Sequence, residues 1–494
     1  MIKIILSHKA YENDAYPIVK AFYPKEEILV KGSKDVIIEE GNLSKVHSCI
    51  QIDFGNDKIE IVITHNKDRK YKTITETPDP VKDKAAYKNA MKRQLYKMLS
   101  SISNIKLPWG ILTGIRPVKL VYEMLDRGMD DSEIYNFMER EYLCSREKID
   151  ISIDIAKRER KLLHEIDYKK GYSIYIGIPF CPSTCLYCSF TSYSVERHAD
   201  RITSYLNALE KEIKYGSTCF PDKKLTSVYL GGGTPTTLSA EQLDRLLGLI
   251  REQYDFTHVR EFCVEAGRPD SISRKKLEVL KKWGVDRISI NPQTMQQKTL
   301  DLIGRRHTVE QIEEAFYLAR ETGHENINMD IIIGLPNESP EDVIDTLNNI
   351  EKLNPESLTV HTLALKRAAR LNTEKENYKN LQAVDVPRMM EATMEFAKKK
   401  GYLPYYLYRQ KNMADNLENI GYAKEGKEGL YNILIMEEKQ TILAFGAGAM
   451  SKFVFHDENR IERVENVKSL TDYISRIDEM IARKKEFLLK NPQL

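Results

Sequence analysis

The sequence predicts an α/β protein whose central part is a parallel sheet of six strands, flanked by an α+β segment on each side. From about residue 172, short β-branched runs alternate with charged amphipathic segments, which is the pattern of repeated β-α units. Buried strands that are separated by helices imply a parallel sheet. The expected strands cover 173–178, 225–230, 261–265, 287–290, 327–333 and 357–363.

Helices are expected between these strands, and the spacing fits either an open doubly wound sheet or a partial barrel. In both architectures the functional groups collect at the carboxyl ends of the strands. Each motif described below lies just after, or late in, one of the six strands. The expected helices cover 196–215, 239–254, 271–283, 308–322 and 340–353.

The flanking segments predict an N-terminal domain over 1–165 and a C-terminal domain over 381–494, around a central domain over 170–380. The N-terminal domain is expected to be α+β, with no chemistry indicated by its residues. The C-terminal domain is also expected to be α+β and to cover the substrate. The expected N-terminal elements are strands near 2–7, 26–31, 48–54 and 58–64, a helix between the first two strands, and helices from 83 to 165 around a loop at 107–120. The expected C-terminal elements are a helix at 385–400, a strand at 402–409, a hairpin over 431–449 and a helix at 467–489.

Charge and hydropathy exclude several classes of partner. The 494 residues include 75 Lys and Arg against 73 Asp and Glu, so the net charge of +2 indicates neither nucleic acid nor an anionic membrane as partner. The start of the sequence lacks the apolar core of a signal peptide, and no later run approaches a membrane span. We therefore expect a soluble cytoplasmic protein, in which the seven cysteines are thiols, metal ligands or catalytic groups.

Three of the cysteines form a compact motif directly after the first expected barrel strand. In YIGIPFCPSTCLYCSF, the thiols of Cys181, Cys185 and Cys188 have the spacing C-x3-C-x2-C. A zinc site needs a fourth Cys or His at a matching distance, and none lies nearby. Three buried thiols, or a redox pair with a spare, are the alternative, but three thiols in eight residues rarely pack together by chance.

A four-iron cluster that is bound by only three thiolates keeps one iron open for another ligand. S-adenosylmethionine binds such an iron through its amino and carboxylate groups, and an electron from the cluster then cleaves the sulfonium to give a carbon radical. The cofactor performs this reaction, while the protein supplies orientation and excludes competing reactions. The motif therefore predicts a [4Fe-4S] cluster with S-adenosylmethionine.

The triplet, with Tyr187 before its last cysteine, resembles that of radical S-adenosylmethionine enzymes. YIGIPFC is similar to the Y-x-H-I-P-F-C stretch of the oxygen-independent coproporphyrinogen III dehydrogenases, and the resemblance spans about 172–370, with weaker similarity to about 455. It implies a partial (β/α)6 barrel, a [4Fe-4S] cluster on Cys181, Cys185 and Cys188, and two molecules of S-adenosylmethionine.

Two further motifs follow the second and third expected strands. The glycines of LGGGTPT at 230–236 let backbone groups approach a ligand closely, although a glycine run alone is more often a turn. Glu265 ends the third strand, where a carboxylate accepts hydrogen bonds from ribose hydroxyls; the alternative is a surface ion pair with Arg268. The resemblance assigns cofactor contacts to Gly232, Gly233 and Thr234, and ribose binding to Glu265.

The remaining cofactor residues come from the later strands. Asp330 lies inside the fifth strand, where a buried carboxylate needs a partner such as Arg305 or a ligand ammonium. The resemblance assigns a second S-adenosylmethionine to the positions of Gln293, Arg305 and Asp330. Further family contacts match Tyr175, Tyr187, Ala364 and Met450.

Two positions depart from the family's best-known branch. Phe190 stands where that branch has a fourth cysteine, and Gly177 stands where it has His. Phe190 instead matches a second branch, which includes heme-trafficking proteins and HemZ-type enzymes. The His-Asn motif of the heme-trafficking proteins is missing from YRQKNMADN at 408–416. The N-terminal extension of about 165 residues, together with the stretch YLYRQKNMADNLENIGY, resembles the HemZ-type group most closely.

The resemblance implies anaerobic oxidative decarboxylation of coproporphyrinogen III to protoporphyrinogen IX in heme biosynthesis. The alternatives are a radical enzyme that methylates or opens heme, and a heme-binding carrier. The implied partners are the tetrapyrrole and an electron donor such as flavodoxin or ferredoxin. A substrate with four carboxylates needs cations, for which we name Lys366, Arg367, Arg370 and Arg409 as candidates. No role is assigned to His307, His361, Cys49, Cys144, Cys219 or Cys263.

Overall fold

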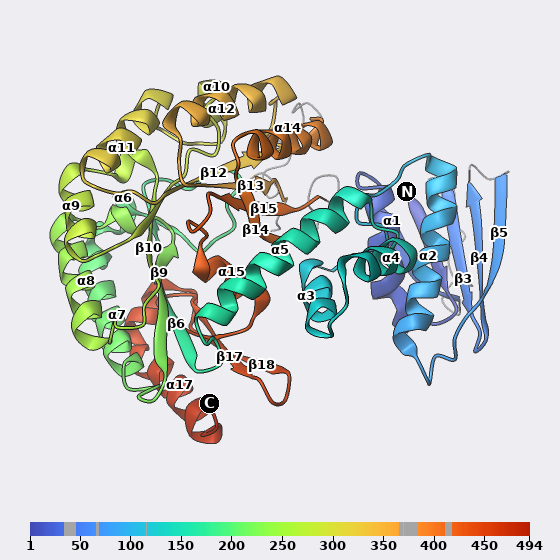
Figure 1. The fold of residues 1–494 in the computed structure, drawn as a ribbon, viewed down its shortest axis with the longest axis horizontal. Coiled ribbons are helices and arrows are strands. Elements are labelled where there is room, and N and C mark those ends of the chain that lie inside the picture. Colours follow the sequence, from blue (N-terminus) through green and yellow to red (C-terminus); the bar gives the residue numbers. More distant parts are fainter. Residues whose placement is uncertain (34–45, 66–68, 115, 365–368, 370–383, 411–416) are drawn as a thin grey trace. The chain divides into compact units, whose positions relative to one another are not determined.

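The computed structural model describes residues 1–33, 46–65, 69–114, 116–364, 369, 384–410 and 417–494 (Figure 1). The chain divides into two compact units, chiefly Met1–Ala156 and, in the second, Lys157–Met413 with Leu417–Leu494. Within the described ranges, no helix is both long and apolar enough to cross a membrane.

The first unit is a five-stranded mixed sheet that packs against helices. Its strand order is β2-β1-β3-β4-β5, with β1 parallel to both of its neighbours and the later pairs antiparallel. Alternate residues such as Ile2, Ile4 and Leu6 are buried in a core that α1 and α2 complete. The elements are β1 (Ile2–Leu6), α1 (Glu12–Phe22), β2 (Ile28–Gly32), β3 (Ser48–Phe54), β4 (Lys58–His65), β5 (Arg69–Glu76), α2 (Lys84–Ser103), α3 (Val118–Asp126) and α4 (Asp131–Tyr142). The helix α5 (Arg146–Glu165) begins in this unit and ends in the second.

The four expected N-terminal strands and the helices after 83 are confirmed, but β5 was not predicted. Its sequence RKYKTITE is largely polar, and most of its residues are exposed. An edge strand of this kind pairs with one neighbour only and buries little, so it lacks the apolar alternation that identifies a strand in the sequence.

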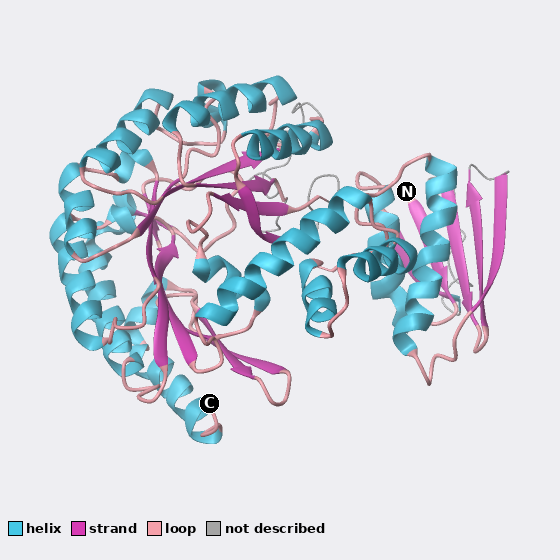
Figure 2. Cartoon of the chain, viewed as in Figure 1, coloured by secondary structure: helices cyan, strands magenta, loops and turns pink. Residues whose placement is uncertain are grey.

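The second unit contains the six expected strands as consecutive parallel neighbours. They are β6 (Gly171–Ile178), β9 (Lys224–Gly232), β10 (Glu261–Gly267), β11 (Arg287–Ile290), β12 (Ile327–Ile333) and β13 (Ser357–Thr362). Helices form an outer arc around them (Figures 1 and 2). The α/β barrel is therefore confirmed.

Local sequence explains where several barrel helices begin. Ser239, Thr308 and Ser339 each accept a hydrogen bond from the backbone three residues on, and the Gln or Asp side chain at that position bonds back to the capping residue. The helices are α6 (Val195–His198), α7 (Ile202–Gly216), α8 (Ala240–Gln253), α9 (Arg274–Lys282), α10 (Gln297–Leu302), α11 (Val309–Glu321) and α12 (Pro340–Leu353). The short α10 was not predicted.

The expected separate domain over 381–494 is instead continuous with the barrel. Its strands extend the same sheet at both ends, because β15 pairs antiparallel with β13 while β16 pairs parallel with β6. The complete order is β14-β15-β13-β12-β11-β10-β9-β6-β16-β17-β18. The elements are α14 (Val386–Lys399), β14 (Leu403–Tyr408), β15 (Asn419–Ala423), α15 (Leu430–Glu437), β16 (Thr441–Phe445), β17 (Met450–Phe455), β18 (Arg460–Glu465), α16 (Leu470–Ser475) and α17 (Ile477–Lys490).

The hairpin expected over 431–449 is wrong, because its first half is the helix α15. The apolar, β-branched run YNILIM favours a strand locally. The carboxylate of Glu261, at the start of β10, accepts the backbone N–H groups of Leu430 and Tyr431 at 2.8 and 2.9 Å. These are two of the donors that a helix leaves unpaired at its N-terminus, so a strand far away in sequence caps α15.

A fully buried carboxylate joins α7 to the C-terminal elements. One oxygen of Glu212 accepts hydrogen bonds from Lys484 Nζ and Asn466 Nδ2, and the other accepts from the Gly446 N–H and the Tyr473 hydroxyl. The Glu212 and Lys484 side chains are both 0% exposed. Because all of these partners are satisfied inside the protein, the network holds the loop that begins at Gly446 beside the barrel.

Removing one partner of this buried pair should destabilise the second unit. We expect Lys484→Met to lower the free energy of unfolding by about 3–5 kcal/mol, because the Glu212 carboxylate is left buried without its cation. Urea denaturation followed by circular dichroism measures this change. The exposed neighbour Lys485 provides the control, since Lys485→Met should cost less than about 0.5 kcal/mol. Equal losses in both variants would contradict the assignment.

Candidate functional site

A cavity of about 750 Å³ lies at the carboxyl ends of the barrel strands. Residues from each of the six parallel strands, or from the loops that follow them, line it, together with residues of β14, α15 and β17. The structure thus brings together side chains that are up to 293 residues apart in sequence, from Tyr175 to Lys468. The lining includes Tyr175, Cys181, Cys185, Tyr187, Cys188, Gly232, Gly233, Thr234, Glu265, Gln293, Arg305, Asp330, Ala364 and Met450, all of which were named from the sequence.

The cysteine loop begins in β7 (Phe180–Cys181) and is fixed at several points. The Leu186 N–H donates to the Ile303 carbonyl at 2.9 Å, and the Thr234 hydroxyl reaches the Cys181 sulfur at 3.6 Å. Burial raises the pKa of Cys181 to about 11. A thiol in such surroundings becomes a thiolate when a cation compensates the charge, as iron does.

The donor set of the cysteine loop fits an iron–sulfur cluster. All seven cysteines are described, and each is outside any disulfide. Among the described residues, no three His, Cys, Asp or Glu side chains already converge at metal-ligand spacing. The fit comes from three thiols on one loop beside the buried guanidinium groups of Arg268 and Arg305, which suit an anionic cluster.

The glycine turn after β9 holds the start of the cysteine loop. The Gly233 N–H donates to the Ile178 carbonyl at 2.8 Å, and the Thr234 N–H donates to the Phe180 carbonyl at 2.7 Å. A Cβ atom at Gly233 would lie 2.5 Å from the Phe180 oxygen, and Gly232 has φ +104°. Both positions therefore require glycine for a structural reason, in addition to any ligand contact.

Glu265 is half-buried among tyrosines near the end of β10. The Tyr229 hydroxyl donates to its Oε1 at 2.6 Å, and the Tyr229 ring stacks on Tyr431 with centroids 4.3 Å apart. Burial raises the pKa of Glu265 to about 7. The alternative of a surface pair with Arg268 is wrong, because Arg268 binds Asp270 instead.

Gln293 is held in a strained conformation just after β11. Its φ of 69° is unusual for a residue with a side chain, and its backbone pairs with the Asp330 carbonyl and the Ile332 N–H at 2.9 Å each. Its Oε1 atom is buried without a hydrogen-bond partner. Such strain and an unsatisfied polar atom are typical of a ligand-binding position.

Arg305 does not pair with Asp330, contrary to one expectation. Its guanidinium donates to the carbonyl of Asn291, and to the Tyr187 hydroxyl at 3.4 Å. Asp330 instead accepts from Asn328 Nδ2 at 2.7 Å and lies 3.8 Å from His361 Nε2. Burial acts to raise the pKa of Asp330, but His361 and Asn328 together hold it below its usual value.

Sequence analysis missed several polar residues of the cavity. His361 is one of them, because its partner Asp330 lies on the neighbouring strand and not nearby in sequence. Lys452 and Lys468 also line the cavity, whereas Arg409 is buried and lies outside the lining. Lys366, Arg367 and Arg370 lie outside the described residues.

Comparison with known proteins gives consistent similarities. A family model described as the radical SAM superfamily matches residues 175–350. The chain is 44% identical over 405 residues to the oxygen-independent coproporphyrinogen-III oxidase-like protein HemZ of Bacillus subtilis, which covers 81% of each chain. It is 34% identical over 314 residues to the heme chaperone HemW of Bacillus subtilis, covering 62% of this chain and 76% of that protein.

One solved structure has the same barrel fold. Coproporphyrinogen III oxidase (HemN) from Escherichia coli, described as a radical SAM enzyme, superimposes with a TM-score of 0.51 and 24% identity. The match covers 65% of this chain and 73% of HemN. The structural likeness supports the barrel architecture.

The environment of Glu265 predicts pH-dependent binding of S-adenosylmethionine. An ionised carboxylate accepts hydrogen bonds from two ribose hydroxyls more strongly than the neutral acid, so if Glu265 binds ribose, affinity should rise as the pH passes through the pKa of about 7. Calorimetric titration of the anaerobic, cluster-loaded protein should show roughly tenfold tighter binding at pH 8 than at pH 6. Glu265→Gln should bind more weakly and lose this pH dependence. Equal affinity of the native protein at both pH values would exclude the assigned role.

Proposed function

The chain belongs to the radical S-adenosylmethionine enzymes, in the family of oxygen-independent coproporphyrinogen III oxidase-like proteins, and we propose that it converts coproporphyrinogen III to protoporphyrinogen IX. Its cofactors are a [4Fe-4S] cluster and S-adenosylmethionine. When bound, they supply a carbon radical that removes a hydrogen atom from the substrate. In the proposed reaction, each of two propionate groups gives a β-hydrogen atom to the radical and then loses carbon dioxide and one electron, which leaves a vinyl group. That electron passes to a one-electron acceptor, and it balances the electron that the donor supplies for each S-adenosylmethionine cleaved.

The observation that carries this proposal is the continuous cavity from the cysteine loop to the C-terminal elements. Tyrosine rings from β6, β9, β14 and α15 line it, including the stacked pair Tyr406 and Tyr408 with centroids 6.2 Å apart. Such rings suit the apolar pyrrole faces of a tetrapyrrole, and their hydroxyl groups suit its polar edge. Lys452 and Lys468 provide cations for propionate groups.

The cofactor contacts that we propose follow the strand ends. Glu265 binds ribose hydroxyls, and the main chain of Gly232 to Thr234 lies against the methionine part. Gln293, Arg305 and Asp330 bind a second S-adenosylmethionine. This is supported by the unsatisfied Oε1 atom of Gln293 and by the ionised Asp330, which suits a ligand ammonium.

The similarity to heme chaperones gives a second candidate. The 34% identity to HemW extends over 76% of that protein, which favours a heme carrier in which the cluster serves regulation. A carrier binds heme without altering it, whereas the proposed enzyme consumes coproporphyrinogen III. The two functions therefore differ in product and not only in ligand.

One anaerobic assay distinguishes these functions. Cluster-loaded protein is mixed with dithionite or reduced flavodoxin, S-adenosylmethionine and either coproporphyrinogen III or heme. We expect 5′-deoxyadenosine, carbon dioxide and protoporphyrinogen IX from coproporphyrinogen III, detected by chromatography. Unchanged coproporphyrinogen III would contradict the proposal: bound, unaltered heme would then identify a carrier, and methylated or opened heme a heme-modifying enzyme.

The cysteine triplet provides the control for this assay. Cys185→Ala should lose the cluster and all three products, since only two thiolates remain on the loop. Cys263→Ala removes a buried thiol of β10 that lies outside the cavity, and it should retain the cluster and most of the turnover. Turnover in Cys185→Ala would show that the reaction does not depend on this site.

A further inference from the structure

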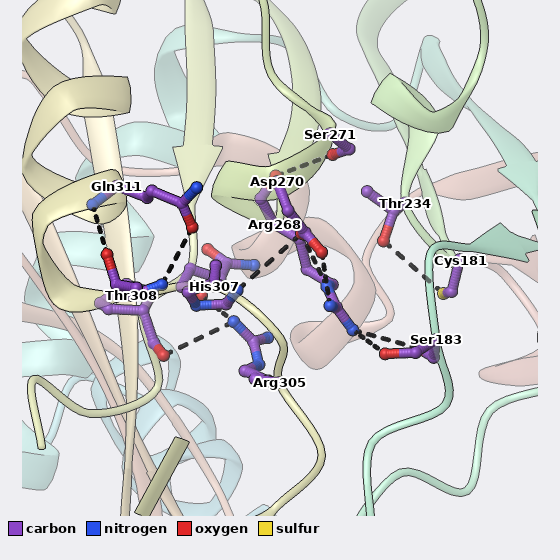
Figure 3. Close-up of polar contacts among 12 residues, drawn as sticks. Cys181, Ser183, Thr234, Arg268, Asp270, Ser271, Arg305, His307, Thr308 and Gln311 are labelled. Atoms are coloured by element: carbon purple, nitrogen blue, oxygen red, sulfur yellow. Dashed lines mark hydrogen bonds and ion pairs between the residues drawn. The ribbon is translucent and has the colours of Figure 1, made fainter. Parts of the chain in front are cut away.

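Arg268 lies beside the cysteine loop at the carboxyl end of β10 (Figure 3). Its Nη1 atom donates to the Ser183 hydroxyl at 2.6 Å and to the Ser183 carbonyl at 3.2 Å, and it lies 4.0 Å from the Cys185 sulfur. The residue is only 3% exposed. Solvent therefore screens its charge weakly, and that charge acts on the sulfur atoms at short range.

The other edge of the same guanidinium is held by Asp270. Nε and Nη2 donate to the two carboxylate oxygens at 2.9 and 2.6 Å, which fixes the plane of the group. Burial acts to raise the pKa of Asp270, but Arg268 holds it below its usual value, so the pair is ionic. Figure 3 shows the guanidinium between Asp270 and Ser183.

The surroundings of this pair are also fixed. The Arg268 carbonyl accepts from the Ser271 N–H and hydroxyl, and the Ser271 hydroxyl lies 2.7 Å from that of Thr236, just beyond the glycine turn. His307 lies 3.8 Å from Asp270, and burial lowers the pKa of His307 to about 4. His307 is therefore neutral and adds no further charge.

We propose that Arg268, oriented by Asp270, is a positioning residue that fixes the cysteine loop and raises the reduction potential of the cluster bound by Cys181, Cys185 and Cys188. Reduction adds an electron to the cluster, so a nearby positive charge stabilises the reduced form more than the oxidised form. Asp270 opposes this effect with its own charge while it keeps the guanidinium in place. The inference concerns the cluster alone and is independent of which tetrapyrrole reacts.

The two partners predict shifts of opposite sign. Arg268→Gln removes the cation and should lower the reduction potential of the cluster. We expect the equilibrium constant for one-electron reduction to fall at least tenfold, which corresponds to about 59 mV. Arg268→Lys keeps the charge but loses the two-pronged contact, so it should give an intermediate value. Asp270→Asn keeps an acceptor for the guanidinium but removes the opposing charge, so it should raise the potential. If the substitutions merely loosened the cysteine loop, the reduction potentials of both variants would shift in the same direction.

The test is a redox titration of anaerobically reconstituted protein, monitored by electron paramagnetic resonance, with iron and sulfide measured for each variant. No tetrapyrrole is added, so failure of the proposed reaction does not affect the result. Arg320→Gln is the matched control, because Arg320 also binds both oxygens of a carboxylate, that of Glu356. Glu356 precedes β13 and so lies at the end of the barrel opposite the cysteine loop. Its potential should equal that of the native protein.

The proposal is overturned if Arg268→Gln retains full iron and its potential is unchanged, or if Asp270→Asn lowers or leaves the potential. If Arg268→Gln does not retain iron, the reduction potential of Asp270→Asn alone tests the proposal. A raised potential in Asp270→Asn supports the role of Arg268, and any other result excludes it.

Discussion

Two backbone hydrogen bonds between the glycine turn and the cysteine loop set the geometry on which the rest of the site depends. They join Gly233 to Ile178 and Thr234 to Phe180, and they form because β6 and β9 are parallel neighbours with Ile178 opposite Gly232. The carboxyl ends of the two strands are thereby locked together, which places the first cysteine beside the Thr234 hydroxyl. The glycines thus allow the close backbone contacts that position the cysteine loop, in addition to any contact with a ligand.

Charge is divided within the cavity in a way that suits two unlike cofactors. The guanidinium groups of Arg268 and Arg305 are adjacent to Cys185, where an anionic cluster needs cations. The carboxyl groups of Glu265 on β10 and Asp330 on β12 interact with each other, and their negative charge suits a ligand ammonium or sulfonium group. Arg268 and Arg305 are buried and the two carboxyl groups are half-buried, so the charge state of each group depends on its neighbours.

Much of this arrangement could be predicted from the sequence, because strand positions and short motifs are local. The six barrel strands and the cysteine and glycine motifs are each contained in one segment. What could not be predicted depends on distant contacts. Glu261 caps α15 from 169 residues away and overrides the strand preference of that run. The partner of Asp330 is His361 on the next strand, and Arg268 turns away from Glu265 toward Asp270.

The C-terminal elements complete the barrel, and this has a consequence for specificity. Both ends of the six-stranded sheet are paired by strands of the last hundred residues, so neither β6 nor β13 is an open edge. The same segment contributes Tyr406, Tyr431 and Lys452 to the cavity. The cysteines, Glu265 and Asp330 lie within the range that matches the superfamily model, 175–350, whereas these C-terminal residues lie beyond it. Substrate choice can therefore change through β14, α15 and β17 while the residues proposed to generate the radical stay the same.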